Sequence, residues 1–225
     1  VSGLNGAAMS QHEVVFIPPA GSEGDPLNDD VVRPRRFAGW GDLPLVWQHG
    51  IIASLLLRPT PTLHATLRQT ADSLGLSDGE YIGVHIRRGH KWVEASSVPL
   101  ERYINASLAV AAQCQHRVRS ALVVSEDPTV VSQLTSRPAV AGLRFVATSH
   151  TRRGLKISIP LALRLGLLDV EEENEVSLVN LFLLSRACGI VGTFSSGYGR
   201  LAYELAVAEQ RRMIPHVSLD VRYHV

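Results

Sequence analysis

The strongest constraint on the fold of this chain is a regular alternation of short β-rich runs with segments of helical spacing, which begins near Gly39. The β-rich runs occupy 81–86, 121–124, 143–147 and 189–194. The segments with helical spacing occupy 44–57, 61–74, 99–111, 128–134, 175–187 and 198–208. Segment 148–174 is expected to be a loop with a short apolar helix or turn at 161–168. Because parallel strands need crossover connections, the alternation predicts an α/β fold: a parallel sheet with helices on both faces.

The first part of the chain differs from the rest. Segment 18–36 is rich in Pro, Gly and charged residues, so we expect a loop there, preceded by a short strand at 13–17. We predict an N-terminal arm at 1–38, interpreted as the remnant of an upstream domain, and one Rossmann-like domain at 39–225. A domain of that length can bury a sizeable core.

Composition excludes several classes of protein. The chain has 22 Lys and Arg against 21 Asp and Glu, so its formal charge of +1 argues against a nucleic-acid partner. No apolar run reaches the roughly 20 residues that span a bilayer, so membrane attachment is expected only through an anchor absent from this chain. The two cysteines, Cys114 and Cys188, fit either one disulfide or two free thiols.

A cluster of potentially cationic side chains follows the predicted strand at 81–86. Arg87, Arg88, His90 and Lys91 come directly after it, and His85 lies inside it. Arginine pairs with phosphate through a rigid fork of donors, and the carboxyl ends of parallel strands are where such sheets bind ligands. The alternative for the basic residues is a solvated turn, and the alternative for His85 is a core histidine with satisfied hydrogen bonds.

Two other predicted strands end in polar residues. Ser195, Ser196 and Gly197 join a strand to the start of a helix, where hydroxyls and backbone N–H groups favour anions. Glu126 and Asp127 follow another strand and could contact ligand hydroxyls or a basic partner. The alternatives are an ordinary turn with a serine cap and an acidic helix cap. Together the three turns indicate a site for a nucleotide with a short phosphate chain, and no metal site is expected.

Four stretches resemble the α1,6-fucosyltransferases and the related bacterial chitooligosaccharide fucosyltransferases. VHIRRGHKWVEA with PLERYI resembles their first donor-site motif, SEDP their second, and GTFSSGYGRLAYEL with SLD their third. GDLPLVWQHGIIASLLLRPTPTL resembles the segment just upstream of the first motif. The stretches occur in the family's order, from about Gly39 to the C-terminus.

The resemblance implies the donor-binding half of a GT-B-like, inverting glycosyltransferase. Such an enzyme transfers L-fucose from GDP-fucose, without a metal or other cofactor, to the innermost GlcNAc of an N-glycan in α1,6 linkage. It implies that Arg87 holds the donor diphosphate and that Arg88 is the motif's second arginine, a catalytic candidate. It also implies that Ser196 contacts the β-phosphate and that His85 lies near the nucleoside. Glu94, acting with Lys91, is the nearest match to the family's proposed base.

The remaining implied donor-binding residues are Glu126, Asp127, Asn180, Ser195 and Gly197. The sequence departs from the family's pattern at His90, where an acid is usual, and in the interval from Lys91 to Glu94, which is one residue shorter. Asn180 stands where an aspartate contacts guanine, and Gly197 where a glutamine is usual.

These departures keep two alternatives open. The chain could be a catalytically silent family member that binds a nucleotide sugar or a glycan. It could also be a transferase with another acceptor, such as a chitooligosaccharide or a peptide. The expected partners are GDP-fucose and an oligosaccharide or glycoprotein acceptor, and the expected location is the Golgi lumen if the source is eukaryotic. Since about forty residues precede the donor half, we expect a fragment or a reduced family member.

Overall fold

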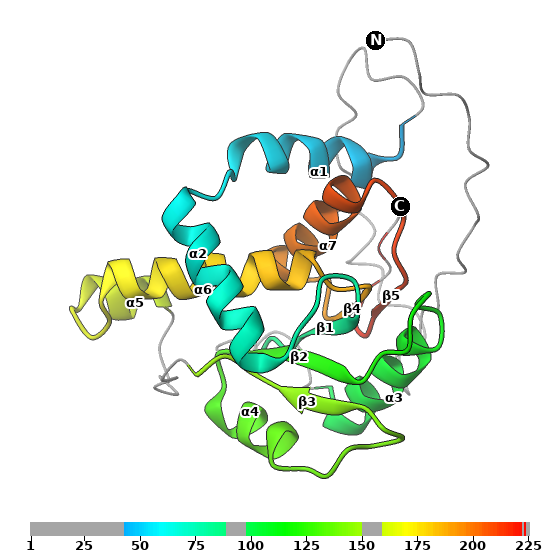
Figure 1. The fold of residues 1–225 in the computed structure, drawn as a ribbon. Coiled ribbons are helices and arrows are strands. Elements are labelled where there is room, and N and C mark those ends of the chain that lie inside the picture. The colour runs from blue at the N-terminus through cyan, green and yellow to red at the C-terminus, as the bar shows by residue number, and fades with distance from the viewer. Residues whose placement is uncertain (1–42, 89–97, 150–158, 222, 224–225) are drawn as a thin grey trace.

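The computed structural model describes residues 43–88, 98–149, 159–221 and 223. Its sheet has five parallel strands in the order β3-β2-β1-β4-β5 (Figure 1). The strands are β1 (Tyr81–His85), β2 (Ser120–Val124), β3 (Arg144–Val146), β4 (Gly189–Gly192) and β5 (His216–Ser218). The helices described are α1 (Leu45–Leu56), α2 (Pro61–Leu74), α3 (Leu100–Ala111), α4 (Pro128–Thr135), α5 (Ile159–Arg164), α6 (Val170–Ser185) and α7 (Gly197–Gln210).

The sheet is covered on both faces, because alternate strand residues point to opposite sides. Tyr81, Leu122 and Ile190 pack with buried side chains of α2, α6 and α7 in one apolar core. Ile82 and Val123 belong to a second core with α3 and α4 on the other face (Figure 1). The α/β fold with a parallel sheet and helices on both faces is therefore confirmed.

Local signals explain where several helices begin and end. Pro61 opens α2 while the Thr60 hydroxyl accepts a hydrogen bond from the N–H of Leu63 at 3.2 Å. That helix ends at Gly75, which adopts the left-handed conformation with φ of 63°. Helix α4 begins after Asp127, whose carboxylate accepts a hydrogen bond from the N–H of Thr129 at 2.8 Å and so caps the helix.

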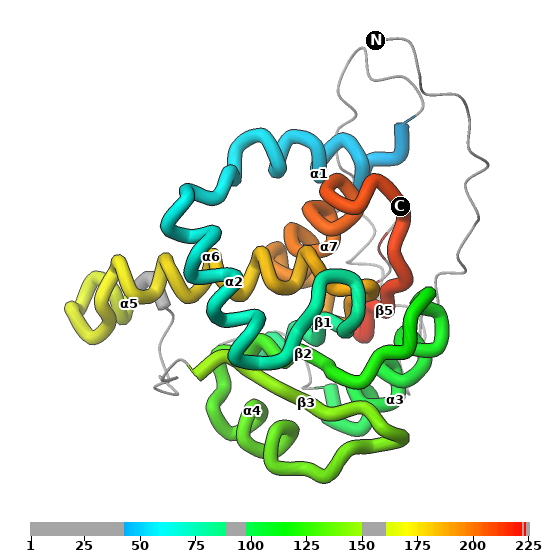
Figure 2. Tube along the Cα trace, in the orientation of Figure 1, coloured from blue at the N-terminus to red at the C-terminus, as the bar shows by residue number. Residues whose placement is uncertain are grey.

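Helix α1 lies against α7 outside the sheet layer (Figure 2). The two helices touch at Gly50, where a Cβ would lie 2.2 Å from the carbonyl oxygen of Glu204. Only a residue without a side chain allows this approach, so Gly50 sets the crossing of the two helices. The His49 Nδ1 reaches the Glu204 carboxylate at 3.1 Å beside this contact.

One prediction of secondary structure was wrong in its bounds, and one strand was not predicted. The loop was expected to extend to residue 174, but α6 already begins at Val170. The Asp169 carboxylate caps this helix by accepting a hydrogen bond from the N–H of Glu172 at 2.9 Å. The first turns of α6 are mostly exposed and acidic, so they carry no apolar periodicity. The short strand β5 was not predicted, because three residues give too little pattern. The predicted strand at 13–17 lies outside the described residues.

A disulfide joins Cys114, just after α3, to Cys188, just before β4, with their Cα atoms 5.9 Å apart. The bond closes a loop with a sequence separation of 74 residues. It therefore ties one helical layer to the central part of the sheet. In the part of the chain that the structure describes, no helix has the length and apolar character that crossing a membrane requires.

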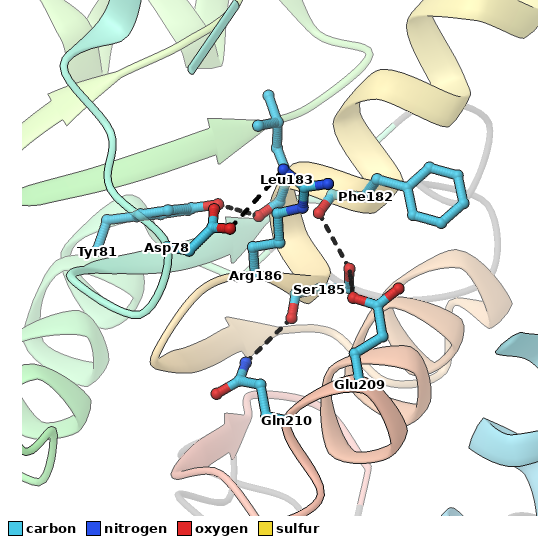
Figure 3. A network of polar contacts seen from close by, with 8 residues as sticks. All are labelled: Asp78, Tyr81, Phe182, Leu183, Ser185, Arg186, Glu209 and Gln210. Carbon is cyan, nitrogen blue, oxygen red and sulfur yellow. Dashed lines mark hydrogen bonds and ion pairs between the residues drawn. The ribbon is translucent and has the colours of Figure 1, made fainter. Parts of the chain in front are cut away.

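Side chains from two other elements form hydrogen bonds at the carboxyl end of α6 (Figure 3). The Gln210 side chain donates to the carbonyl oxygens of Ser185 at 3.1 Å and Ala187 at 2.8 Å. The Tyr81 hydroxyl donates to the carbonyl oxygen of Leu183. The Ser185 hydroxyl donates to the Glu209 carboxylate at 2.9 Å. Side chains of β1 and α7 thus donate hydrogen bonds to carbonyl groups at the end of α6 and just after it.

Candidate functional site

The strand order places one topological switch point at the centre of the sheet. From β1 the chain moves to β2 and then β3, and it returns to form β4 on the other side of β1. In open α/β sheets, ligands bind beyond the carboxyl ends of the strands at such a point. His85 pairs with Gly192 in register, so the turns after β1 and β4 leave the same edge of the sheet side by side. The arginines and the serines named from the sequence lie on these two turns.

The turn after β1 is held by Glu126, which follows β2. The Glu126 carboxylate accepts a hydrogen bond from the backbone N–H of Arg88 at 3.1 Å. It also lies 3.5 Å from the guanidinium of Arg87. The Arg87 side chain is 37% exposed, so its guanidinium retains donors that face solvent at the site. Glu126 therefore orients the basic turn, a role that differs from the direct ligand contact considered from the sequence.

Arg88 is more enclosed than Arg87. Its guanidinium donates to the carbonyl oxygen of Val98 at 3.2 Å, which ties the turn to the segment before α3. Its Nε is buried and has no hydrogen-bond partner among the described residues. The two arginines thus differ: Arg87 is available to a ligand, and Arg88 is partly used inside the protein.

Asp127 serves as the cap of α4, accepting from the N–H groups of Thr129 and Val130 at 2.8 and 3.4 Å. Its own N–H donates to the Ser125 hydroxyl at 3.1 Å. This is the capping role that the sequence offered as the alternative for one of the two acids after β2. Asp127 lies at the same edge as the other candidates, but its carboxylate is directed to its own helix.

The turn between β4 and α7 presents an open helix start. Ser196 is the cap residue of α7, yet its side chain makes no capping hydrogen bond, although its N–H donates to the carbonyl oxygen of Thr193 at 3.1 Å. A Cβ on Gly197 would meet nothing nearer than the Arg200 guanidinium at 3.9 Å. The first N–H groups of α7 are therefore not covered by their own cap, which favours an anion there.

His85 lies beneath this turn. It is buried, and its ring centroid lies 5.2 Å from that of Tyr198 in the first turn of α7. Burial, with a smaller contribution from the Arg87 charge, lowers the pKa of His85 to about 4. The imidazole is therefore neutral at physiological pH. Among the described residues its Nδ1 has no hydrogen-bond partner.

Asn180 lies on α6, and its partner Thr148 follows β3 at the carboxyl edge of the sheet. Asn180 is buried, and its carbonyl oxygen accepts a hydrogen bond from the Thr148 hydroxyl at 3.2 Å. Within the described residues it makes no hydrogen bond to the arginines or serines. Lys91, Glu94 and His90 lie outside the described residues. In the described ranges, no group of three or more His, Cys, Asp and Glu side chains could hold a metal ion.

One residue of this edge was not recognised from the sequence. Asp220 follows β5, and its carboxylate accepts hydrogen bonds from both the N–H and the hydroxyl of Ser195. The available signal was its place in SLD, next to the third motif, but β5 itself was not predicted. Without that strand, no pattern placed residue 220 beside residue 195.

Some known proteins are similar to parts of this chain in sequence or in structure. No protein-family profile matches the chain. An α-(1,6)-fucosyltransferase of Drosophila melanogaster is 28% identical over 190 residues, which cover 77% of this chain and 27% of the Drosophila protein. The crystal structure of POFUT1 in complex with GDP-fucose has a TM-score of 0.53 at 12% identity, over 77% of this chain and 50% of POFUT1. NodZ α-1,6-fucosyltransferase soaked with GDP-fucose has a TM-score of 0.45 at 16% identity, over 66% of this chain and 43% of NodZ.

The similarity to the Drosophila protein confirms the resemblance to α1,6-fucosyltransferases that the motifs indicate. The likeness to POFUT1 agrees with the Rossmann-like fold. The chain spans 27% of the length of its Drosophila relative.

Proposed function

We propose that this chain is the donor-binding part of an inverting fucosyltransferase that binds GDP-fucose without a metal. The observation that carries the proposal is the pairing of β1 with β4 at the switch point. It brings a partly exposed arginine, Arg87, to the same sheet edge as the uncapped start of α7 at Ser196. A guanidinium fork and a free helix start together favour a diphosphate.

The same groups suit the chemistry of the transfer. When the bond between the sugar and GDP breaks, negative charge develops on the β-phosphate oxygen. The Arg87 guanidinium, the Ser196 hydroxyl and the first N–H groups of α7 are donors that can stabilise that charge. Arg88, tied to Val98, and Glu126, which orients the turn, keep the basic turn in place for this role. Glu94, acting with Lys91, would remove the proton from the acceptor hydroxyl as general base.

The acceptor is proposed on the resemblance alone: a GlcNAc residue, fucosylated in α1,6 linkage. The disulfide between Cys114 and Cys188 supports folding in an oxidising compartment, which agrees with a lumenal location such as the Golgi. A chitooligosaccharide or a peptide hydroxyl is the alternative acceptor. Screening acceptors with linkage analysis of the product distinguishes these cases.

A catalytically silent member is the second candidate function. It is favoured by Asn180, whose carbonyl oxygen is already used by Thr148. The second lone pair of that oxygen can still accept a hydrogen bond, but an amide cannot supply the charge-assisted contact that an aspartate gives to a donor base. Binding of GDP without transfer from labelled GDP-fucose would support this candidate.

The test of the proposed function is binding of GDP by calorimetry, together with transfer from labelled GDP-fucose. We expect saturable binding, and we expect Arg87→Ala to weaken it at least about tenfold, because a charge-assisted bidentate contact is lost. Arg137→Ala is the matched control, since Arg137 is a half-exposed arginine that pairs with Glu101 between α3 and α4. Absence of GDP binding by the unmodified protein would contradict the proposal.

A further inference from the structure

The carboxylate of Asp220 lies where the ends of β5 and β4 meet. The N–H of Leu219 donates to the carbonyl oxygen of Gly192 at 2.9 Å, which extends the strand pairing to the last residue before Asp220. Residue 220 therefore leaves the sheet directly beside the turn that starts α7. The side chain of Asp220 is partly buried.

Asp220 gathers four hydrogen bonds in this position. The Ser195 N–H donates to Oδ1 at 3.4 Å and the Ser195 hydroxyl to Oδ2. The Ser218 hydroxyl at 3.2 Å and the Val221 N–H at 2.8 Å also donate to Oδ1. Ser195 is thus held through its main chain and its side chain by one carboxylate. Hydrogen bonds to a charged acceptor are the stronger kind, so this contact fixes the conformation of the turn.

The two serines of the turn are consequently not equivalent. The Ser195 hydroxyl has given its only proton to Asp220, so it has no donor left for an anion. Ser196 makes no capping bond, and its hydroxyl remains available at the start of α7. An anion at this helix start would meet Ser196 and the first N–H groups of α7, and would not receive a hydrogen bond from Ser195.

We propose that Asp220 is a positioning residue that holds the turn at 193–196 so that Ser196 and the start of α7 can receive a phosphate group. This inference rests on the proposed donor site. Asp220 carries the same sign of charge as a phosphate, so its direct electrostatic effect on an anion is unfavourable. It favours binding only through the geometry that it maintains. Charge repulsion weakens phosphate binding and positioning of the turn strengthens it, so a substitution that removes the charge of Asp220 shows which effect is larger.

The test compares Asp220→Asn with unmodified protein, using GDP and guanosine as probes. Asparagine removes the charge and replaces one acceptor oxygen by an N–H donor that cannot accept from Ser195. Positioning predicts that GDP affinity falls roughly tenfold while guanosine affinity stays unchanged, since only GDP uses the phosphate site. Tighter GDP binding by Asp220→Asn would show that charge repulsion dominates and would overturn the inference. Equal losses for both probes would indicate a general structural effect and would also overturn it.

Ser195→Ala provides a milder variant should Asp220→Asn fail to fold. It removes the hydroxyl contact alone, and positioning predicts the same selective loss of GDP affinity. The double variant should be little worse than either single variant, because both remove one shared contact. Asp78→Asn is the matched control: Asp78 is an exposed acid 3.8 Å from Arg186, next to the amino end of β1, and the control should leave both affinities unchanged.

A measurement without ligand keeps the inference separate from the proposed donor site. Hydrogen exchange of the amides at 195–199 should become faster in Asp220→Asn and Ser195→Ala, and stay unchanged in Asp78→Asn. Unchanged exchange in both turn variants would contradict the positioning role. The unmodified protein could bind no GDP while hydrogen exchange at 195–199 becomes faster in both turn variants. In that case the proposed donor site is wrong, and the role of Asp220 in fixing the turn is supported.

Discussion

Gly199 lies so close to His85 that a Cβ on residue 199 would come within 2.9 Å of the imidazole Nδ1. The glycine lets the first turn of α7 pack on the buried histidine that ends β1. Since His85 is fixed in the core, neither partner can move away cheaply. This contact couples the helix start to the strand whose end carries the arginines.

Gly199→Ala should therefore destabilise the protein and disturb the helix start. We expect a loss of about 1–3 kcal/mol in the free energy of unfolding, the usual cost of overpacking, with weaker GDP binding. Gly197→Ala is the control, because a Cβ there meets nothing within 3.9 Å and removes backbone freedom from the unfolded chain. Urea denaturation compares the two, and equal stability of both variants would show that His85 has room to shift.

Two buried histidines should make stability depend on pH. Burial lowers the pKa of His216 to about 4, and burial with the Arg87 charge does the same for His85. In the unfolded chain both titrate near 6.5, so the unfolded state binds more protons between these values. Their contribution is fully present above pH 6.5 and is lost as the pH falls toward 4.

The expected slope is up to about 1.4 kcal/mol per pH unit for each histidine in that window. Glu209 acts in the opposite direction, because burial raises the pKa of its carboxyl and the native state binds its proton more readily. His216→Phe keeps an aromatic ring beside Phe194 and should reduce the slope. Denaturation midpoints at several pH values measure it, and a flat profile from pH 7 to 5 would refute the prediction.

The sequence predicted the strand ends well because buried parallel strands are short apolar runs that stop at polar residues. The basic turn at Arg87 and the serine turn at Ser196 could be placed on one sheet edge from that pattern alone. The role of Asp220 could not, since it depends on a three-residue strand that only tertiary pairing stabilises. Asn180 is similar: its hydroxyl partner, Thr148, lies 32 residues away. Such contacts come from packing and leave no local period.

The disulfide should contribute substantially to stability. Replacing Cys114 and Cys188 by alanine frees a loop of 74 residues in the unfolded chain, and we expect a loss of roughly 2–4 kcal/mol. A reducing agent should lower the denaturation midpoint of the unmodified protein to that of the double alanine variant. It should have no effect on the double alanine variant, which serves as the control. Equal midpoints with and without reductant would mean that the bond adds nothing to folding.

The last prediction concerns Gln210, which satisfies two carbonyl groups at the end of α6 (Figure 3). Gln210→Met keeps the length of the side chain but removes the donor to Ser185 and Ala187. Because both carbonyl groups lie in buried residues, we expect a loss of about 1–3 kcal/mol in the free energy of unfolding. Gln113→Met is the matched control, since Gln113 is exposed and its side chain donates to the carbonyl oxygen of Ala109, in the preceding helix α3, at 3.4 Å. Urea denaturation should place the control within about 0.5 kcal/mol of the unmodified protein. If both methionine variants are equally stable, water reaches the end of α6 and the network is not structural.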